Sequence, residues 1–558
     1  MTFSILSAIA TLALAFTIYK ALSFLRFYTN ARRTGFPVFV SPVFSKSIPW
    51  MILGPALQPV YKKYLPTWIF ERLEICAHGW EFRNKRTFHE RLGNVFVLVT
   101  PDECSLFIAE PALAQSVLQR RIDFPQAPIV AKIMGFLGPN VLCANGDEWK
   151  RHRRMFAANL DERVSRIVWT ESIRQAQDML KYILQHPGNQ TLDGLKSIAM
   201  NVIGKAGFSQ EEQWAPGLRS QLGDKRTGKP AYFETLSLVS QMLLEAAFLP
   251  PSLLKAPIMP RALQLLGFHM ERTPRYVQEV LDEERRATEK EKEREREKGA
   301  GRRNNFLSLL LQLSDEERRS GQSQFSLTDD EISGSLFVFT AAGYETTANT
   351  MGYTVTLLAA YPEWQDWIRE ELQTLPGDPS AWKYEETYPK CRRTLAVMYE
   401  TLRHFPPVLH SSRAIHEPQQ LPSSNGTDTR LLTPPMDVYV SQLSLHLDPS
   451  IWGPDANEFK PSRWLDEAGN LITPEKSTYL PWSGGPRICP GMKMSQVEFV
   501  ATMATLFKKG KCEPLPTAGI TEPAALRERL LAHLEDCVSK LALQMRNPDG
   551  VLLRWTAV

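Results

Sequence analysis

Residues 481–491 read PWSGGPRICPG, and this stretch decides the fold of the chain. Its glycines and prolines predict a tight loop whose backbone can approach a flat group closely. The loop presents Cys489 just before an amphipathic stretch, Met492 to Phe507, which predicts a helix. Backbone N–H groups at the start of a helix can stabilise a thiolate. Cys489 is therefore the candidate metal ligand of this chain.

The pattern aromatic-x-x-Gly-x-Arg-x-Cys-x-Gly is filled by Trp482, Gly485, Arg487, Cys489 and Gly491. It resembles the heme-binding signature of the cytochrome P450 family, and the whole segment resembles the fungal microsomal type. The four fixed Gly-Arg-Cys-Gly positions would recur by chance in roughly one chain of this length in five hundred. The resemblance covers most of the chain after residue 30. It implies a cytochrome P450 fold, mostly α with small β-sheets and a long central helix over the heme.

The resemblance also implies the cofactor, heme b (iron protoporphyrin IX), with Cys489 as its metal ligand. Thiolate ligation pushes electron density onto the iron and favours O–O cleavage. Arg487 can pair with a heme propionate. The family usually has Phe where this chain has Trp482, which affects packing near the thiolate rather than the ligation. The other six cysteines are expected to be structural.

A long and mostly apolar run from Ile332 to Leu358 predicts a helix buried through the centre of a large domain. Ser326 or Thr328 can cap it, and acidic residues at 329–331 favour its first turn. Two long amphipathic stretches, from about Arg163 to Gln185 and from Tyr232 to Phe248, predict further helices. Residues 94–100 and Leu552 to Trp555 are expected to be strands.

The central run carries AAGYETT, residues 341–347, which resembles the family pattern [AG]-G-x-[DE]-T-[TS]. The resemblance implies that Glu345 and Thr346 are the acid and the alcohol of a proton relay for oxygen activation. Gly343 is expected to remove a side chain where the helix faces the heme. The alternative is that glycine and threonine only let this helix pack closely against a neighbour.

Three further pieces match family positions. Glu400 and Arg403 form an E-x-x-R that resembles the structural ion pair of the family, with Arg463 as third member of the triad. Trp149 and Arg153 resemble a W-x-x-x-R whose two side chains share a helix face and can reach a heme propionate. Arg413 matches another propionate-binding position.

Composition excludes several other classes. Hydrophobic residues make up 43% and charged residues 23% of the 558, so the chain can build a substantial core. The formal net charge is only +4, and without a concentrated basic patch no nucleic-acid partner is expected. Seven scattered cysteines without a CxxC pair argue against a disulfide framework or a zinc site and favour a reducing compartment.

Residues 3–19 lack any charge and are mostly apolar, and basic residues follow at Lys20, Arg26, Arg32 and Arg33. This arrangement predicts a single-pass anchor in the endoplasmic reticulum membrane, with the catalytic domain in the cytosol. A cleaved signal peptide, the rival interpretation, would need a basic start. The expected organisation is an anchor over 1–25, a linker rich in proline and aromatic residues over 26–70, and a heme-thiolate catalytic domain over 71–558.

By the resemblance, the substrate pocket takes its walls from the loop between Asp123 and Leu142, the central helix and Val408 to Ser412. Apolar side chains dominate these segments, so a lipophilic small-molecule substrate is expected. The candidate pocket residues are Phe339, Ala342, Val408 and His410. For His410, an ordinary structural role is the alternative to a substrate contact.

The resemblance implies a monooxygenase that inserts one oxygen atom from O2 into its substrate, in secondary-metabolite biosynthesis. Electrons would come from NADPH through a separate cytochrome P450 reductase, with cytochrome b5 as a further candidate partner. Lys150, Arg151 and Arg154 form a candidate docking face for the reductase. Two alternatives stay open: an oxygen-independent heme-thiolate isomerase or dehydratase, and a non-catalytic heme-binding protein. The substrate, the carbon attacked and the number of oxidation steps do not follow from the sequence.

Overall fold

The protein is described by a computed structural model that covers residues 2–216, 229–298, 305–319, 326–422, 429–517 and 519–558. The described chain is mostly helical with small sheets, which confirms the predicted fold class. It forms two compact units from segments far apart in sequence. Unit 1 comprises Met1–Pro128, Val408–Asn457 and Pro474–Ile488, and unit 2 comprises Ile129–Pro407, Glu458–Thr473 and Cys489–Val558. The predicted catalytic domain, 71–558, therefore contributes residues to both units.

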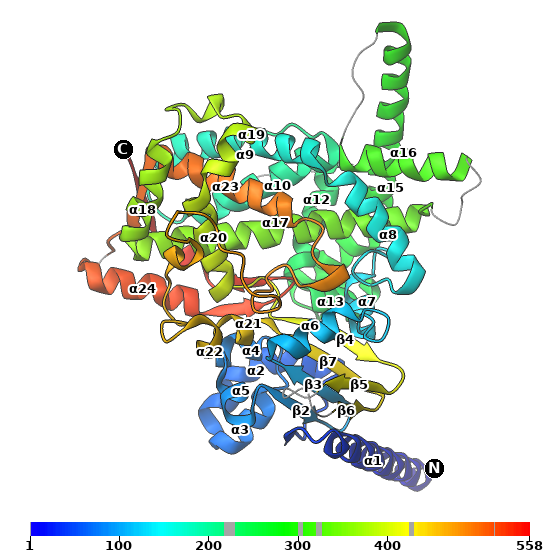
Figure 1. Ribbon diagram of the computed structural model, residues 1–558. Coiled ribbons are helices and arrows are strands. Elements are labelled where there is room, and N and C mark those ends of the chain that lie inside the picture. Colours follow the sequence, from blue (N-terminus) through cyan, green and yellow to red (C-terminus); the bar gives the residue numbers. More distant parts are fainter. Residues whose placement is uncertain (1, 217–228, 299–304, 320–325, 423–428, 518) are drawn as a thin grey trace. The chain divides into compact units, whose positions relative to one another are not determined.

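Unit 1 is organised around a five-stranded sheet with the strand order β1-β2-β3-β7-β4 (Figure 1). The pairs β1–β2 and β3–β7 are parallel, whereas β2–β3 and β4–β7 are antiparallel. A separate antiparallel hairpin joins β5 to β6. The strands are β1 (Val38–Val40), β2 (Val95–Val99), β3 (Cys104–Ile108), β4 (His410–Ile415), β5 (Gln419–Pro422), β6 (Thr429–Leu432) and β7 (Met436–Ser441).

Strand β2 is buried on both faces, which explains why its sequence is a continuous apolar run rather than an alternating one. Val95, Val97 and Val99 enter one hydrophobic cluster of the unit. Phe96 and Leu98 enter a second cluster. The strand predicted over residues 94–100 is confirmed.

The helices of unit 1 flank this sheet. They are α1 (Thr2–Arg33), α2 (Ile48–Tyr64), α3 (Thr67–Glu74), α4 (Trp80–Asn84), α5 (Thr87–Leu92), α6 (Pro111–Gln119), α21 (Gln442–His446) and α22 (Pro449–Trp452), with the short 3-10 helix η4 at Gly485–Arg487. Residues 26–70, predicted as a linker, hold the end of α1, the sheet strand β1, all of α2 and the start of α3. Pairing of β1 with β2 builds this segment into the unit.

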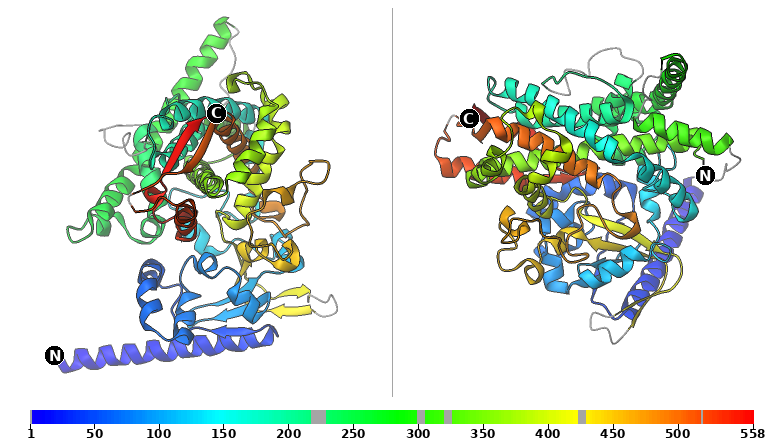
Figure 2. Two further views of the ribbon diagram at one scale, coloured as in Figure 1. Left: turned by 90° about the vertical axis from the view of Figure 1, so that its left-hand side faces the viewer. Right: turned by 45° about the horizontal axis from the view of Figure 1, so that its top comes forward.

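Helix α1 contains one stretch, Ala10–Arg33, that is long and apolar enough to cross a membrane. The predicted anchor, 1–25, overlaps it, but the helix continues without a break into the core of unit 1. Phe24 and Phe27 pack against the sheet cluster, and Ala31 is fully buried there. Figure 2 shows α1 as one uninterrupted rod.

Unit 2 is a body of helices with two small antiparallel pairs, β8–β11 and β9–β10. Its first half contains α7 (Pro128–Met134, which starts at the unit boundary), α8 (Gly146–Asn159), α9 (Glu162–Ile183), α10 (Gln190–Phe208), α12 (Lys229–Gln241), α13 (Leu243–Phe248), α14 (Pro251–Leu254), α15 (Arg261–Lys298), α16 (Phe306–Arg319) and α17 (Asp329–Ala360). Its second half contains α18 (Pro362–Gln373), η1 (Pro379–Ala381), α19 (Tyr384–Thr387), η2 (Tyr388–Lys390), α20 (Arg392–His404), η3 (Pro461–Trp464), α23 (Met492–Lys509), β8 (Gly510–Pro514), α24 (Pro523–Glu535), β9 (Cys537–Ser539), β10 (Leu543–Met545), η5 (Pro548–Gly550) and β11 (Leu553–Ala557).

Helix α17 is the central helix that the sequence predicts (Figure 1). Thr328 caps it, and Glu331 closes a capping box by accepting from the Thr328 N–H at 2.8 Å. Most of its residues are buried, as expected of a helix that is apolar nearly all round. The predicted helices from Arg163 and from Met492 correspond to α9 and α23, and the stretch from Tyr232 to Phe248 divides into α12 and α13.

Candidate active site

Cys489 stands in unit 2, two residues ahead of the Gly491 that caps α23. The cysteine is exposed, yet enough protein surrounds it that desolvation raises the pKa of the thiol. A hydrogen bond from the Gly491 N–H and the charge of Arg153 act in the opposite direction. The backbone donor at the helix start is the thiolate-stabilising arrangement that the sequence predicts.

Arg153 and Trp149 lie one turn apart on α8, in the same unit as Cys489. Trp149 is buried, and Arg153 is partly accessible. Desolvation lowers the pKa of Arg153, and the Cys489 charge acts against this shift. The structure therefore brings Arg153 into electrostatic range of the candidate ligand.

Arg413 lies in unit 1, on strand β4, and is only 3% exposed. Its side chain donates to the Gln126 Oε1 at 2.9 Å and to the Ser412 carbonyl oxygen at 2.8 Å. Among the described residues no carboxylate pairs with it, its Nε is buried without a partner, and burial lowers its pKa to about 10. A buried guanidinium with only neutral partners is suited to bind an anionic group such as a propionate.

Gly485, Arg487 and Trp482 belong to the loop segment of unit 1. Gly485 has φ +65°, and a Cβ there would lie 2.3 Å from the Leu118 carbonyl oxygen of α6. Close contact with α6 and a left-handed backbone thus require this glycine. Arg487 is partly accessible at the end of η4, and the Trp482 ring meets Tyr479 edge-on at 6.2 Å.

Gly491 behaves differently from Gly485. A Cβ at residue 491 would lie 3.9 Å from the Cys489 Sγ, which is an ordinary contact, and the backbone φ of −86° suits any residue. The polypeptide itself therefore does not require glycine here, whereas a flat group against the sulfur would. Gly491 and the exposed Cys489, both in unit 2, therefore fit a heme as the bound group.

Glu345 is buried on α17, and burial raises the pKa of its carboxyl group. Lys196 of α10 and Lys540, between β9 and β10, act against that shift through their charges. The Glu345 Oε2 is buried and has no hydrogen-bond partner in the described part of the chain. An acid with a raised pKa and a spare oxygen suits a proton-carrying role.

Thr346 follows on the partly accessible face of α17 that also includes Ala342 and Asn349. Its Oγ1 donates to the Ala342 carbonyl oxygen at 2.7 Å. Thr350 repeats this contact one turn later by donating to the Thr346 carbonyl oxygen at 2.8 Å. Hydroxyl groups bound in this way occupy backbone acceptors and loosen the helix locally.

Gly343 lies where α17 packs against a neighbouring helix. A Cβ at residue 343 would lie 2.6 Å from the Ile203 Cδ1 of α10. Gly343 therefore lets α17 pack closely on α10, which is the packing alternative that the sequence left open. The expectation that this position faces the heme stays a prediction.

A feature that the sequence reasoning missed lies one turn beyond Thr346. A small cavity of about 20 Å³ is lined in part by Lys196, Asn349 and Gln544. This volume can hold one water molecule. The Asn349 Nδ2 is buried and has no partner among the described residues, so a water there would satisfy it. The only sequence signal is a polar amide within a mostly apolar helix.

Glu400, Arg403 and Arg463 are brought together in unit 2. Glu400 and Arg403 are both fully buried, and Arg403 donates to both carboxylate oxygens, at 2.9 Å and 2.8 Å. Arg463 donates to the Glu400 Oε1 at 3.1 Å. Burial alone would raise the pKa of Glu400, but hydrogen bonds from Arg403 and His404 outweigh it and hold the pKa far below its usual range.

The candidate docking face on α8 is smaller than predicted. Lys150 and Arg154 are exposed, but Arg151 pairs with Glu331 at the start of α17. His152 is buried beside the same carboxylate, with its Nε2 3.6 Å from the Glu331 Oε1. Arg151 and His152 thus join α8 to α17.

The pocket candidates of unit 2 occupy different environments. Phe339 stacks on Phe306 of α16 with ring centroids 4.2 Å apart, so its ring fills a helix–helix interface. Ala342 is partly accessible on α17. The loop before α8 packs tightly on this helix, because a Cβ at Gly138 would lie 2.1 Å from the Asp330 carbonyl oxygen.

The pocket candidates of unit 1 are His410 and Val408. His410 Nδ1 lies 2.5 Å from the Oε1 of the buried Glu81, and its ring meets Tyr439 edge-on at 4.9 Å. These contacts give His410 the structural role that the sequence left as an alternative. Val408 is 47% exposed.

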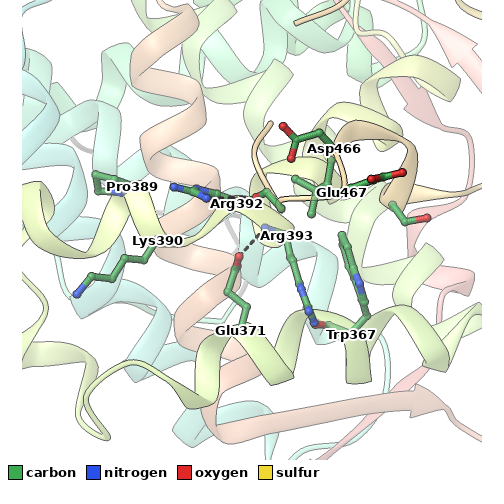
Figure 3. Close-up of a pocket in the computed structure, with 11 residues that line it drawn as sticks. Trp367, Glu371, Pro389, Lys390, Arg392, Arg393, Asp466 and Glu467 are labelled. Carbon is green, nitrogen blue, oxygen red and sulfur yellow. Dashed lines mark hydrogen bonds between the residues drawn. The ribbon is translucent and has the colours of Figure 1, made fainter. Parts of the chain in front are cut away.

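The cavity drawn in Figure 3 lies elsewhere in unit 2, between α18, the start of α20 and the loop after η3. It has a volume of about 550 Å³, and Glu371, Arg392, Arg393 and Asp466 are among its lining residues. Glu371 accepts from the Arg393 N–H at 2.6 Å and so satisfies a donor at the start of α20. A cavity with this charged lining does not suit a lipophilic substrate, and none of the predicted site residues lines it.

Comparisons with known proteins agree with this geometry. Residues 65–529 match the family model described as cytochrome P450, and this range includes every predicted site residue. The chain is 30% identical to the phomenoic acid biosynthesis cluster cytochrome P450 monooxygenase of Leptosphaeria maculans, over 92% of each chain. It is 26% identical to cytochrome P450 monooxygenase ORF6 of Penicillium roqueforti, over 90% of each chain. It is also 30% identical to cytochrome P450 monooxygenase 124 of Postia placenta, over 75% of this chain and 77% of that protein.

Proposed function

Because this chain belongs to the cytochrome P450 family of monooxygenases, we propose that it inserts one oxygen atom of O2 into a lipophilic small molecule of secondary metabolism. The observation that carries the proposal is the pair Glu345–Thr346 on α17, in the same unit as Cys489. Oxygen activation requires protons, and a buried acid next to a hydroxyl group suits their delivery. One relative is named for a biosynthesis cluster, which supports the metabolic context.

Heme is the cofactor of the family, and when bound it supplies the oxidising chemistry. We assign Cys489 as the thiolate ligand of the iron. Arg153, Arg413 and Arg487 are proposed to neutralise the propionates, since a guanidinium pairs well with a carboxylate. The supporting residues of this site are Trp149, Trp482, Gly485 and Gly491.

Within the relay, Glu345 stores the proton and Thr346 passes it on. The raised pKa of Glu345 favours the protonated form of its carboxyl group, which suits a proton store. The Thr346 hydroxyl, which donates to Ala342, can turn from that backbone acceptor toward a water molecule. A water in the cavity at Asn349 would resupply Glu345, with Lys196 on the cavity wall as a charged neighbour.

Electrons are proposed to come from NADPH through a separate reductase, with cytochrome b5 as a further donor. Lys150 and Arg154 are the exposed cations of α8 and can meet an acidic partner surface. Helix α1 is proposed to cross the endoplasmic reticulum membrane once. The basic residues after its apolar stretch favour a cytosolic catalytic domain.

The test is expression with a reductase in microsomes, followed by product analysis across terpenoid and polyketide scaffolds under 18O2. The expected result is NADPH-dependent incorporation of one labelled oxygen into a product. Conversion that persists without oxygen would show an isomerase or dehydratase. If no scaffold stimulates NADPH oxidation although the reductase works, the protein would be a heme-binding protein without catalytic turnover.

A paired substitution tests the relay itself. Thr346→Ala should raise the ratio of NADPH consumed to product formed by about tenfold or more, because general acid–base groups contribute at least that factor. Thr350→Ala removes the same type of hydroxyl-to-carbonyl hydrogen bond from the next turn of α17 and is the control. Equal coupling in both variants would contradict a role for Thr346 in proton delivery.

A further inference from the structure

Unit 2 contains a group of three side chains that the proposed reaction does not use. Glu148 and His152 belong to α8, and Glu331 belongs to the first turn of α17. Each residue offers one ligand atom, and the three atoms all lie within 4.8 Å of one another. An imidazole and two carboxylates are nitrogen and oxygen donors that zinc accepts in proteins. No cysteine takes part, so the cysteine spacing that argues against a cysteine zinc site does not bear on this group.

The sequence of α8 places two of the three donors on one face of the helix. Glu148 and His152 are four positions apart, the same spacing as the two histidines of an H-E-x-x-H zinc motif. Glu148 is exposed, whereas His152 is fully buried. The third donor is fixed from α17, because the Glu331 Oε2 accepts from the Thr328 N–H at 2.8 Å. The other oxygen of Glu331, Oε1, is the one that lies beside His152.

The His152 ring is the observation that points to a cation. Its Nδ1 lies 3.4 Å from the Ser335 hydroxyl group of α17. Its Nε2 is buried and has no hydrogen-bond partner in the described part of the chain, an arrangement that costs free energy in a protein interior. Burial lowers the pKa of the His152 imidazole, which favours its neutral form. When Nδ1 donates to Ser335, Nε2 carries a lone pair, and this is the form in which a histidine binds a metal.

The spacing of His152 and Glu331 suits a bridging metal ion rather than a direct contact. The His152 Nε2 lies 3.6 Å from the Glu331 Oε1, which is too far for a hydrogen bond. A nitrogen and an oxygen that each lie about 2.1 Å from a tetrahedral zinc ion are roughly 3.4 Å apart. A zinc ion between these two atoms would satisfy the nitrogen, and Glu148 can supply the third ligand from the solvent side.

Arg151 competes for the same carboxylate. Its guanidinium pairs with the Glu331 Oε1, the oxygen that lies beside His152. The Arg151 side chain is 25% exposed, so the guanidinium can turn toward solvent. A cation that binds the Glu331 Oε1 has to displace this guanidinium, and Arg151 therefore weakens cation binding at the site.

We propose that Glu148, His152 and Glu331 bind one zinc ion, with water in the fourth position, and that this ion clamps α8 to the start of α17. The imidazole favours zinc over magnesium and calcium, which prefer oxygen ligands alone. The exposed Glu148 gives the ion access from solvent. Zinc binding here requires neither heme nor oxygen, so it is independent of the proposed monooxygenase reaction.

The experiment is equilibrium dialysis of the full chain with its heme, washed with a chelator, against buffered zinc ions, with the bound zinc counted per protein. Glu148→Gln removes an exposed ligand and should lower the zinc affinity of the site at least about tenfold. Asp147→Asn is the matched control: it removes the neighbouring exposed carboxylate of α8, which pairs with Lys150, and should bind zinc as wild type does. Arg151→Gln should bind zinc more tightly than wild type, because the competing guanidinium is gone.

Zinc K-edge X-ray absorption identifies the bound ligands, and a shell of nitrogen and oxygen with one imidazole is expected. Circular dichroism reports folding in every variant, independently of heme and zinc. Because Glu148 is exposed, Glu148→Gln leaves the buried contacts of His152 and Glu331 in place. Equal zinc affinity in wild type and Glu148→Gln, an unchanged affinity in Arg151→Gln, or sulfur ligands in the absorption spectrum would overturn the proposal.

Discussion

Glu400→Gln should be among the most damaging single substitutions in unit 2. The carboxylate is fully buried and, besides His404, whose Nε2 lies 3.6 Å from its Oε1, it accepts from five N–H groups of the described residues. These are Arg403 Nε at 2.9 Å, the terminal nitrogen of Arg403 at 2.8 Å, Arg463 Nε at 3.1 Å, the Lys460 N–H at 2.8 Å and Trp464 Nε1 at 2.9 Å. Glutamine keeps the shape but removes the charge and directs N–H groups at these donors.

The size of the effect follows from Arg403, which is also fully buried. Removing the partner of a buried charge costs about 3–5 kcal/mol, a large part of the roughly 5–15 kcal/mol that stabilises a folded domain. The pKa of Glu400 is depressed in the folded state, so its contribution is present above the ordinary value of 4.5 and is lost as the pH falls below it. The difference in unfolding free energy between wild type and Glu400→Gln should therefore become smaller as the pH is lowered.

The assay is urea denaturation of the heme-loaded protein, monitored by the thiolate-type band of its reduced carbon monoxide complex. Glu467→Gln, an exposed carboxylate in the loop after η3, is the matched control and should behave as wild type. Arg403→Lys should lower the free energy of unfolding more than Arg463→Lys, because the Arg403 guanidinium donates to both carboxylate oxygens of Glu400. The reasoning fails if Glu400→Gln unfolds within about 0.5 kcal/mol of wild type, the usual spread for neutral surface changes.

Three further outcomes are expected. Cys489→Ser should abolish the thiolate-type Soret band of the reduced carbon monoxide complex, whereas Cys512→Ser, a buried cysteine elsewhere in unit 2, should keep it; a persisting band in the first variant would refute the ligand assignment. Gly485→Ala should lower the unfolding free energy of the heme-free protein by about 1–3 kcal/mol, because residue 485 has a left-handed backbone, whereas Gly491→Ala should lower heme content and leave that free energy unchanged. An equal loss of unfolding free energy in the two heme-free variants would contradict this distinction. Because burial raises the pKa of Glu345, the folded state holds its proton more tightly than the unfolded chain, and Glu345 destabilises the folded state as the pH rises above 4.5. The melting temperature of Glu345→Gln relative to wild type should therefore increase from acidic to neutral pH, and a constant difference between the two melting temperatures would count against a raised pKa.

Features with strong local signals could be predicted from the sequence. The long helix α17 follows from an apolar run preceded by Thr328 and a group of acids, and the structure adds only its capping box. The buried strand β2 follows from its continuous apolar run. The candidate site residues follow from their resemblance to family motifs, and the structure supplies the partners that spacing cannot give, such as Gln126 for Arg413.

Features that depend on contacts between distant segments could not be predicted. Prolines and aromatic residues over 26–70 predict a linker, but the first turn of a helix tolerates proline, and Pro49 lies in the first turn of α2. Strand β1 forms because it pairs with β2, with Val38 opposite Val97. Gly343 carries no local sign that its neighbour on α10 is Ile203. The pairing of Arg151 with Glu331 joins residues 180 positions apart, so α8 could not be divided into paired and exposed cations beforehand.

The unbroken path of α1 into the core of unit 1 has a mechanical consequence. A rigid rod transmits rotation as well as position, so the sheet of unit 1 cannot swivel independently of the segment proposed to cross the bilayer. Each residue inserted between Leu22 and Phe24 would turn that segment by about 100° and shift it by about 1.5 Å relative to the sheet. Each insertion there should therefore change both the rotation and the height of the sheet of unit 1 relative to the segment proposed to cross the bilayer.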